Sequence, residues 1–201
     1  MQNNLAKVFS VIFHPLVMPS IGILLIFFSG IYSGFLTFEQ KRAIFLIVFT
    51  GTLLLPVCLI PLYMLFKIIR NVEMNSLRER ILPLFFTTAI YFFTFYLISG
   101  FSLPRVINLF LTGTIICVSA VFFISILWKI SAHMVGVGGL AGMLLAVSFI
   151  HSLNLLGLII PVIIVAGLLG FSRLELKAHT PAQVYAGFLK GAGIMLLVFY
   201  I

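Results

Sequence analysis

Residues 106–128 read VINLFLTGTIICVSAVFFISILW, a run without a single charged side chain. A helix that crosses the hydrocarbon core of a bilayer needs about 20 consecutive apolar residues, so this run is long enough to span a membrane. The whole chain has the same character, because 63% of its 201 residues are hydrophobic and only 8% are charged. An average soluble domain is about a quarter charged. The sequence therefore predicts one all-α domain, residues 1–201, that forms a polytopic transmembrane helix bundle.

This composition excludes several classes of protein. The apolar runs leave no room for a separate soluble domain, and their lack of alternation excludes a water-filled β-barrel. The net charge of +8 does not indicate a nucleic-acid binder, because the bases must lie at membrane edges or in a polar cavity. Membrane lipids with anionic head groups, or phosphates, are the expected partners. Cys58 and Cys117 lie inside apolar runs and imply neither a disulfide framework nor a metal site.

The apolar runs number seven, or six if one short run is re-entrant. The first contains Pro15 and Pro19 but no clear signal-peptidase site, so we expect it to be retained as a helix. The seven predicted spans are residues 8–30, 43–69, 81–99, 106–128, 134–150, 155–171 and 184–201.

Three polar breaks between these runs fall on one membrane face, since an even number of predicted crossings separates each pair. They lie near residues 70–80, 129–133 and 172–183, and they contain two histidines, several arginines and the serines Ser131 and Ser172. Such residues suit phosphoryl transfer through a histidine, in which arginines and hydroxyls hold the phosphate oxygens, one imidazole attacks phosphorus and another protonates the leaving oxygen. No metal or other cofactor is expected, because the chain has no aspartate and no pair of acids suited to magnesium.

At these breaks the sequence resembles the type 2 phosphatidic acid phosphatase superfamily of integral membrane lipid phosphatases, as a divergent member. Ser172-Arg173, five residues and His179 reproduce the start of that family's Ser-Arg-x5-His-x3-Asp motif, and Ser131-Ala132-His133 approximates its Ser-Gly-His motif. The resemblance covers residues 67–190 and implies a phosphatase-like core there. It implies that His179 is the nucleophile, that His133 is the general acid and that Gln183 holds the place of the orienting aspartate. The phosphate-binding residues that it implies are Arg173, Ser131, Arg80, Arg78, Ser172 and Lys129.

The chain departs from the family pattern at several positions. Gln183 replaces the aspartate of the third motif, and Ala132 replaces the glycine of the second. In the first motif, Lys-x6-Arg-Pro, the position seven residues before Arg80 is Glu73, and the proline, Pro83, follows three residues later. Two predicted spans also separate the first two motifs, which in the family share one loop.

The resemblance implies a metal-independent phosphatase that releases phosphate from a lipid phosphate such as phosphatidic acid, or from an isoprenoid (di)phosphate such as an undecaprenyl one, through a phosphohistidine. The alternative is a non-catalytic protein that binds or transports lipid phosphates, which Gln183 favours. A third interpretation is a structural subunit in which the bases are interfacial anchors. The implied location is a bacterial inner (plasma) membrane. The excess of bases on the motif face favours the cytoplasmic side, whereas the family favours the periplasmic or luminal side.

Three further features have less specific interpretations. The glycines of residues 136–142, with Gly187, Gly191 and Gly193, predict close packing between helices rather than a phosphate loop. His14 and His151 are expected to be structural. Lys190 is an intramembrane charge that either lines the predicted site or extends to the membrane surface.

Overall fold

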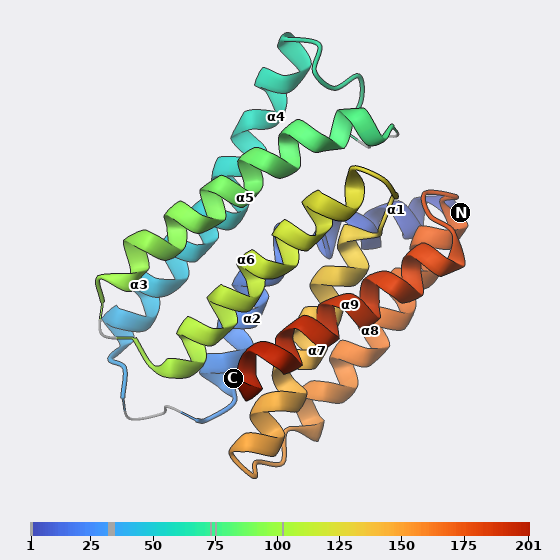
Figure 1. Cartoon of the computed structure of the whole chain (residues 1–201). Helices are drawn as coiled ribbons and strands as arrows, with labels where there is room; N and C mark the ends of the chain where they lie inside the picture. Colours follow the sequence, from blue (N-terminus) through green and yellow to red (C-terminus); the bar gives the residue numbers. More distant parts are fainter. Residues whose placement is uncertain (1, 32–34, 73, 75, 102) are drawn as a thin grey trace.

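The structure is a computed structural model that describes residues 2–31, 35–72, 74, 76–101 and 103–201, without the side chains of residues 2 and 3. Figure 1 shows most of its helices running side by side in an elongated bundle. The elements in chain order are α1 (Gln2–Ile12), α2 (Met18–Phe28), α3 (Phe38–Phe49), the π-helix η1 (Thr50–Leu54), α4 (Leu55–Leu65), α5 (Leu77–Ser99), α6 (Arg105–Ser125), α7 (Ala132–Ile150), α8 (Leu156–Glu175) and α9 (Pro181–Tyr200).

Six helices in the described part of the chain are long and apolar enough to cross a membrane. The first of them combines α3, η1 and α4, and the others are α5, α6, α7, α8 and α9. The predicted all-α, polytopic membrane bundle is therefore confirmed, with the lower of the two expected numbers of spans. The protein is an integral membrane protein.

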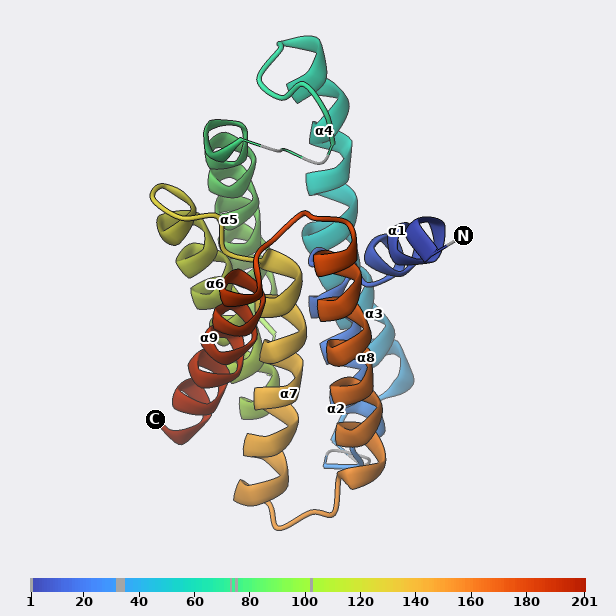
Figure 2. The same cartoon turned by 90° about the vertical axis from the view of Figure 1, so that its right-hand side faces the viewer.

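The first apolar run is not one crossing helix, and the expected single helix over residues 8–30 is wrong. α1 ends at Ile12 and α2 begins at Met18. The break falls at Pro15, because proline has no N–H and disfavours helical backbone at the residue before it. α2 has 11 residues, so it is about 16 Å long and crosses only about half of the hydrocarbon core. Figure 2 shows α1 lying across the long axes of the other helices, beside the end of α8.

The three polar breaks of the sequence meet at one end of the bundle, as predicted. The Arg80 guanidinium donates to the carbonyl oxygen of Ile130 at 3.2 Å, which joins the start of α5 to the turn before α7. The backbone N–H of Ser131 donates to the carbonyl oxygen of Gln183 at 3.4 Å, which joins the starts of α7 and α9. The residues with potential chemistry are thus brought together from three widely separated parts of the chain.

Glycines allow α7 and α9 to pack backbone against backbone. A Cβ at Gly138 would meet the carbonyl oxygen of Phe188, and one at Gly191 would meet the carbonyl oxygen of Val135. At Gly187 a Cβ would lie 2.8 Å from the Ser131 carbonyl oxygen. These contacts confirm the predicted close packing through small residues. The same prediction is wrong for Gly193, where a Cβ would meet nothing within 4 Å.

The π-helix η1, in the middle of the first crossing helix, is hydrogen-bonded to α5. Pro56 has no N–H and cannot donate to the carbonyl oxygen four residues earlier, that of Thr52. The buried hydroxyl of Tyr91, on α5, donates to this oxygen instead, at 3.2 Å. The hydroxyl of Thr52 in turn donates to the carbonyl oxygen of Leu16 at 3.5 Å, so the π-helix also holds the segment between α1 and α2.

Gly191→Ala is expected to destabilise the protein by about 1–3 kcal/mol, because the new methyl group would push against a backbone carbonyl that cannot move independently of α7. The measurement is the thermal unfolding midpoint of the purified protein in detergent. Gly193→Ala, on the same helix, is the matched control and is expected to be neutral or stabilising by up to about 1 kcal/mol. Equal midpoints for the two variants would contradict the packing role assigned to Gly191.

Candidate functional site

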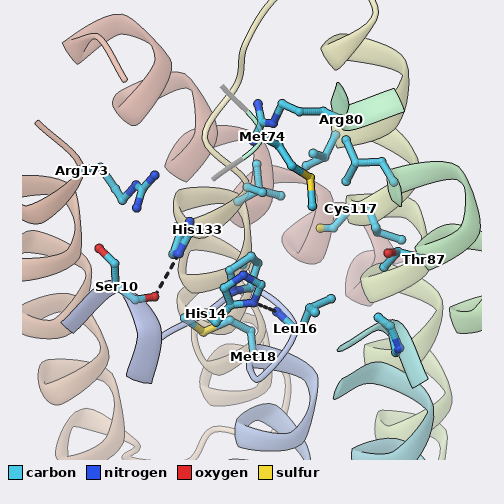
Figure 3. A pocket seen from close by; sticks show the side chains of 18 of the residues that line it. Ser10, His14, Leu16, Met18, Met74, Arg80, Thr87, Cys117, His133 and Arg173 are labelled. Carbon is cyan, nitrogen blue, oxygen red and sulfur yellow. Dashed lines mark hydrogen bonds between the residues drawn. The ribbon is translucent and has the colours of Figure 1, made fainter. Parts of the chain in front are cut away.

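A cavity of about 800 Å³ opens within the bundle where the polar breaks meet. Its lining contains both ionisable and apolar side chains, and Figure 3 shows residues of both kinds. The ionisable side chains come from α1, α5, α7, α8 and the segments between helices, and they form what is called here the polar part of the lining: Lys7, His14, Arg80, Lys129, His133, Arg173, Glu175, Lys177 and His179. Most of the remaining lining residues are apolar, among them Pro19, Ile60, Leu84, Phe110, Val121, Leu140 and Met195. The cavity therefore suits a molecule with a charged head and an apolar body.

His179 lies in the turn between α8 and α9 and is only 8% exposed. Its Nδ1 atom is 3.1 Å from Oε1 of Gln183 and 3.2 Å from the carbonyl oxygen of Lys129. Both neighbours are oxygen acceptors, so the network assigns the proton of the neutral ring to Nδ1. The other ring nitrogen, Nε2, then carries the lone pair, as a nucleophilic histidine requires.

Gln183 has two functions at this position. Its Oε1 accepts the backbone N–H of Thr180 at 3.1 Å, and its own backbone N–H donates to the Thr180 hydroxyl at 3.4 Å, so the two residues form a capping box at the start of α9. The same Oε1 accepts from His179, four residues before it. Helix capping therefore fixes the amide in the orientation that holds the imidazole.

His133 is held by the segment that precedes α2. Its Nε2 atom lies 3.1 Å from the carbonyl oxygen of Ser10, so Nε2–H is the donor. In a regular α-helix the N–H of His14 would donate to the Ser10 carbonyl oxygen. At the end of α1 it donates instead to the carbonyl oxygen of Val11, at 3.2 Å, so the Ser10 carbonyl can accept from His133. The break before Pro15 thus supplies the acceptor that orients a histidine more than 100 residues away.

Positive charge dominates the polar part of the cavity. Burial, together with the neighbouring charges of Arg80 and Arg173, lowers the pKa of His179 from 6.5 to about 4. Burial and the charge of Arg173 likewise lower the pKa of His14 to about 4. Both histidines are therefore neutral at pH 7. Among the residues that the structure describes in the lining, Glu175 is the only acid, so the site as a whole attracts an anion.

The residues that the motifs single out do not all reach the cavity. Five of them line it: Arg80, Lys129, His133, Arg173 and His179. Two others lie next to lining residues, because Gln183 bonds to His179 and Ser131 precedes Ala132. The remaining two predicted phosphate ligands lie outside the lining, since Arg78 is exposed and the hydroxyl of Ser172 donates to the Leu168 carbonyl at 2.8 Å.

Other expectations about single residues can also be compared with the structure. Lys190 is exposed and does not line the cavity, so the first of its two interpretations is wrong. Glu73 lies outside the described residues. No group of three or more His, Cys, Asp or Glu side chains in the described part of the chain is arranged to hold a metal ion.

The sequence did not single out His14, Lys7 or Lys177, which also line the cavity. His14 was expected to be structural. The signal that could have identified it is its chemistry, since an ionisable residue inside an apolar segment next to a proline marks a candidate functional position.

Comparisons of the chain with protein-family models, with curated proteins and with solved structures find no match. The resemblance to the phosphatase superfamily therefore depends on the motif residues alone.

The stability of the protein is expected to fall as the pH is lowered from about 6.5 towards 4. His14 and His179 resist protonation in the folded state, so in this range the unfolded chain binds more protons, and the free energy of unfolding decreases with each of them. Above about pH 6.5 the stabilisation is fully present. The measurement is the thermal midpoint in detergent at about pH 7.5 and about pH 5. His179→Asn is expected to make the difference between the two thermal midpoints smaller. A midpoint of the natural protein that is unchanged or higher at the lower pH would refute the prediction.

Proposed function

We propose that this protein is a membrane phosphatase that removes phosphate from a lipid phosphate or an isoprenoid (di)phosphate, with His179 as the nucleophile. The observation that carries the proposal is the mixed lining of one cavity, to which arginines and histidines contribute charged and polar groups and apolar side chains contribute most of the rest. A phosphate head would lie among the bases while the lipid tail remained in apolar surroundings. Such a substrate would enter sideways between helices from the bilayer.

The bases supply the electrostatic part of the proposed reaction. Arg80, Arg173 and Lys129 would hold the non-bridging oxygens of the phosphate, where a buried site strengthens each charge-assisted hydrogen bond. The first turn of α7 adds backbone N–H groups, because its N-cap residue, Ser131, makes no side-chain capping bond. The Ser131 hydroxyl is fully buried and has no hydrogen-bond partner in the described part of the protein. Because Ser131 does not line the cavity, this hydroxyl would reach a bound phosphate only if the start of α7 shifted.

The proposed first step forms a bond between Nε2 of His179 and phosphorus. The bond from phosphorus to the leaving oxygen breaks, and this oxygen takes a proton from His133, whose imidazolium form would be stabilised by the negative charge of the bound phosphate and whose other N–H is held by Ser10. In the second step a water molecule attacks phosphorus, the nitrogen–phosphorus bond breaks and His133 takes a proton from the water. The electron pair returns to Nε2. Atoms and charges balance without a metal.

Gln183 supports a second candidate function, a protein that binds or transports lipid phosphates without hydrolysing them. A phosphohistidine carries positive charge on its ring, and the neutral amide of Gln183 holds Nδ1–H without offering a compensating negative charge. In a serine protease, the comparable change from Asp to Asn costs about 10⁴-fold in rate. The residues that would bind the phosphate are the same for both functions. The proposed location, the inner (plasma) membrane of a bacterium, follows from the family resemblance.

The purified protein in detergent is expected to release inorganic phosphate from short-chain phosphatidate or from an isoprenoid phosphate, with a chelator present throughout. His179→Ala is expected to lower this rate at least about a thousandfold, because it removes the attacking atom. Phosphate release is measured colorimetrically. The matched control is His151→Ala, which removes an exposed histidine in the turn after α7. Release that persists in His179→Ala would refute the phosphohistidine mechanism.

Gln183→Glu is expected to raise the rate of phosphate release by about 10- to 100-fold, because a carboxylate of the same length would stabilise the charged ring. Gln183→Met, which has a similar length but no amide acceptor, is expected to lower it. A rate for Gln183→Glu at or below that of the natural protein would contradict the orienting role of this position. If the natural protein binds phosphatidate but neither it nor Gln183→Glu releases phosphate, the transport function is favoured.

A further inference from the structure

His14 places a third imidazole at the polar part of the cavity, outside all three motif segments. It lies in the break between α1 and α2, and its ring meets that of His133 edge-on, with centroids 5.4 Å apart and planes at 78°. Figure 3 shows Arg173, His133 and His14 following one another along the same side of the cavity. The charge of Arg173 acts on His14, so the two side chains share one electrostatic environment.

The backbone that follows His14 fixes the orientation and the tautomer of its ring. The N–H of Leu16 donates to Nδ1 of His14 at 3.3 Å. An atom that accepts a hydrogen bond carries no proton, so the neutral ring is protonated at Nε2. The contact from residue i to the N–H of residue i+2 has the connectivity of an Asx-turn, in which an Asn or Asp side chain accepts the same N–H.

The turn that carries His14 is held to the rest of the bundle. The Leu16 carbonyl accepts a bond from the hydroxyl of Thr52, in the π-helix, and the Thr52 carbonyl accepts one from the hydroxyl of Tyr91 on α5. Two helices that cross the membrane therefore anchor a segment that does not cross it. This arrangement presents an N–H donor to a cavity lined by Arg80, Arg173 and Lys129.

We propose that His14 is a further phosphate-binding residue, which donates its Nε2–H to an oxygen of the phosphate group held in this cavity. The ligand chemistry rests on the proposed function, but the role of His14 does not require hydrolysis. The phosphate belongs either to a lipid head group or to free inorganic phosphate.

The test uses two substitutions that separate the two nitrogen atoms of the ring. In His14→Asn the side-chain oxygen still accepts the Leu16 N–H, as in an Asx-turn, but the amide N–H₂ is too short to reach the position of Nε2. In His14→Gln the longer amide keeps a donor near the position of Nε2 and gives up the turn contact. Equilibrium binding of dihexanoyl phosphatidate and of inorganic phosphate is measured for both variants and for the natural protein in detergent. Phosphate release is measured separately, and thermal midpoints report on folding.

His14→Asn is expected to bind both probes at least about tenfold more weakly, which is the effect of one hydrogen bond to a charged group. His14→Gln is expected to bind within about threefold of the natural protein, although its thermal midpoint is lower. Weaker binding of phosphatidate alone would assign the contact to the lipid-linked phosphate rather than to free phosphate. The proposal is overturned if His14→Asn binds both probes normally, if His14→Gln alone is impaired, or if the natural protein binds neither probe. Binding that depends on His14 in a protein that releases no phosphate would refute the phosphatase function and leave this inference intact.

Discussion

The site depends on the backbone contact between α7 and α9. Without side chains at Gly138 and Gly191, carbonyl groups of each helix approach the other closely enough to align their first turns. This alignment brings the Ser131 N–H to the Gln183 carbonyl and the Lys129 carbonyl to the ring of His179. In a bilayer no hydrophobic effect drives helices together, so close packing of small residues is the principal source of such precision. The glycines that stabilise the bundle therefore also determine the distances at the candidate site.

The second constraint is electrostatic. Several bases and a single acid line the described polar part of one cavity, in surroundings of low polarity. Charges of the same sign repel strongly there, and an anion relieves this repulsion. The protein limits the cost when the site is empty by keeping His14 and His179 neutral at pH 7. The Arg80 guanidinium bonds to a carbonyl oxygen, which partly replaces its lost hydration. Stability alone does not explain this cluster of bases, because apolar side chains at the same positions would stabilise the folded protein more.

The sequence predicted the parts of the structure that follow from the membrane itself. A run of about 20 apolar residues can satisfy its backbone in a bilayer only as a helix, so most spans could be recognised from composition. Counting crossings then placed the three polar breaks on one face. The family resemblance likewise implied the contact between His179 and Gln183, which the structure contains. Helical geometry also explains why Arg80 lines the cavity while Arg78, about 200° away around α5, does not.

Two features could not be predicted in the same way. The interruption between α1 and α2 at His14 cannot be recognised in the sequence. The residues around it are as apolar as those of a crossing helix, and prolines occur within such helices as well. The hydroxyl of Ser172 illustrates a second difficulty, since in apolar surroundings a serine satisfies its donor on the preceding helical turn. Motif spacing alone does not reveal this local alternative. The break at His14 and the hydrogen bond of Ser172 both depend on the local path of the backbone, which the types of the residues alone do not specify.

The break between α1 and α2 has a consequence for the order in which the molecule is made. Ser10 and His14 leave the ribosome before their partners in the cavity, because His133 lies at the start of α7 and Arg173 lies on α8. During translation Ser10 and His14 cannot make their contacts with His133 until α7 has been synthesised. The site is consequently completed only after α9 has been inserted and packed on α7. A truncated chain that ends before the last helix would contain every residue of the first segment and no working cavity.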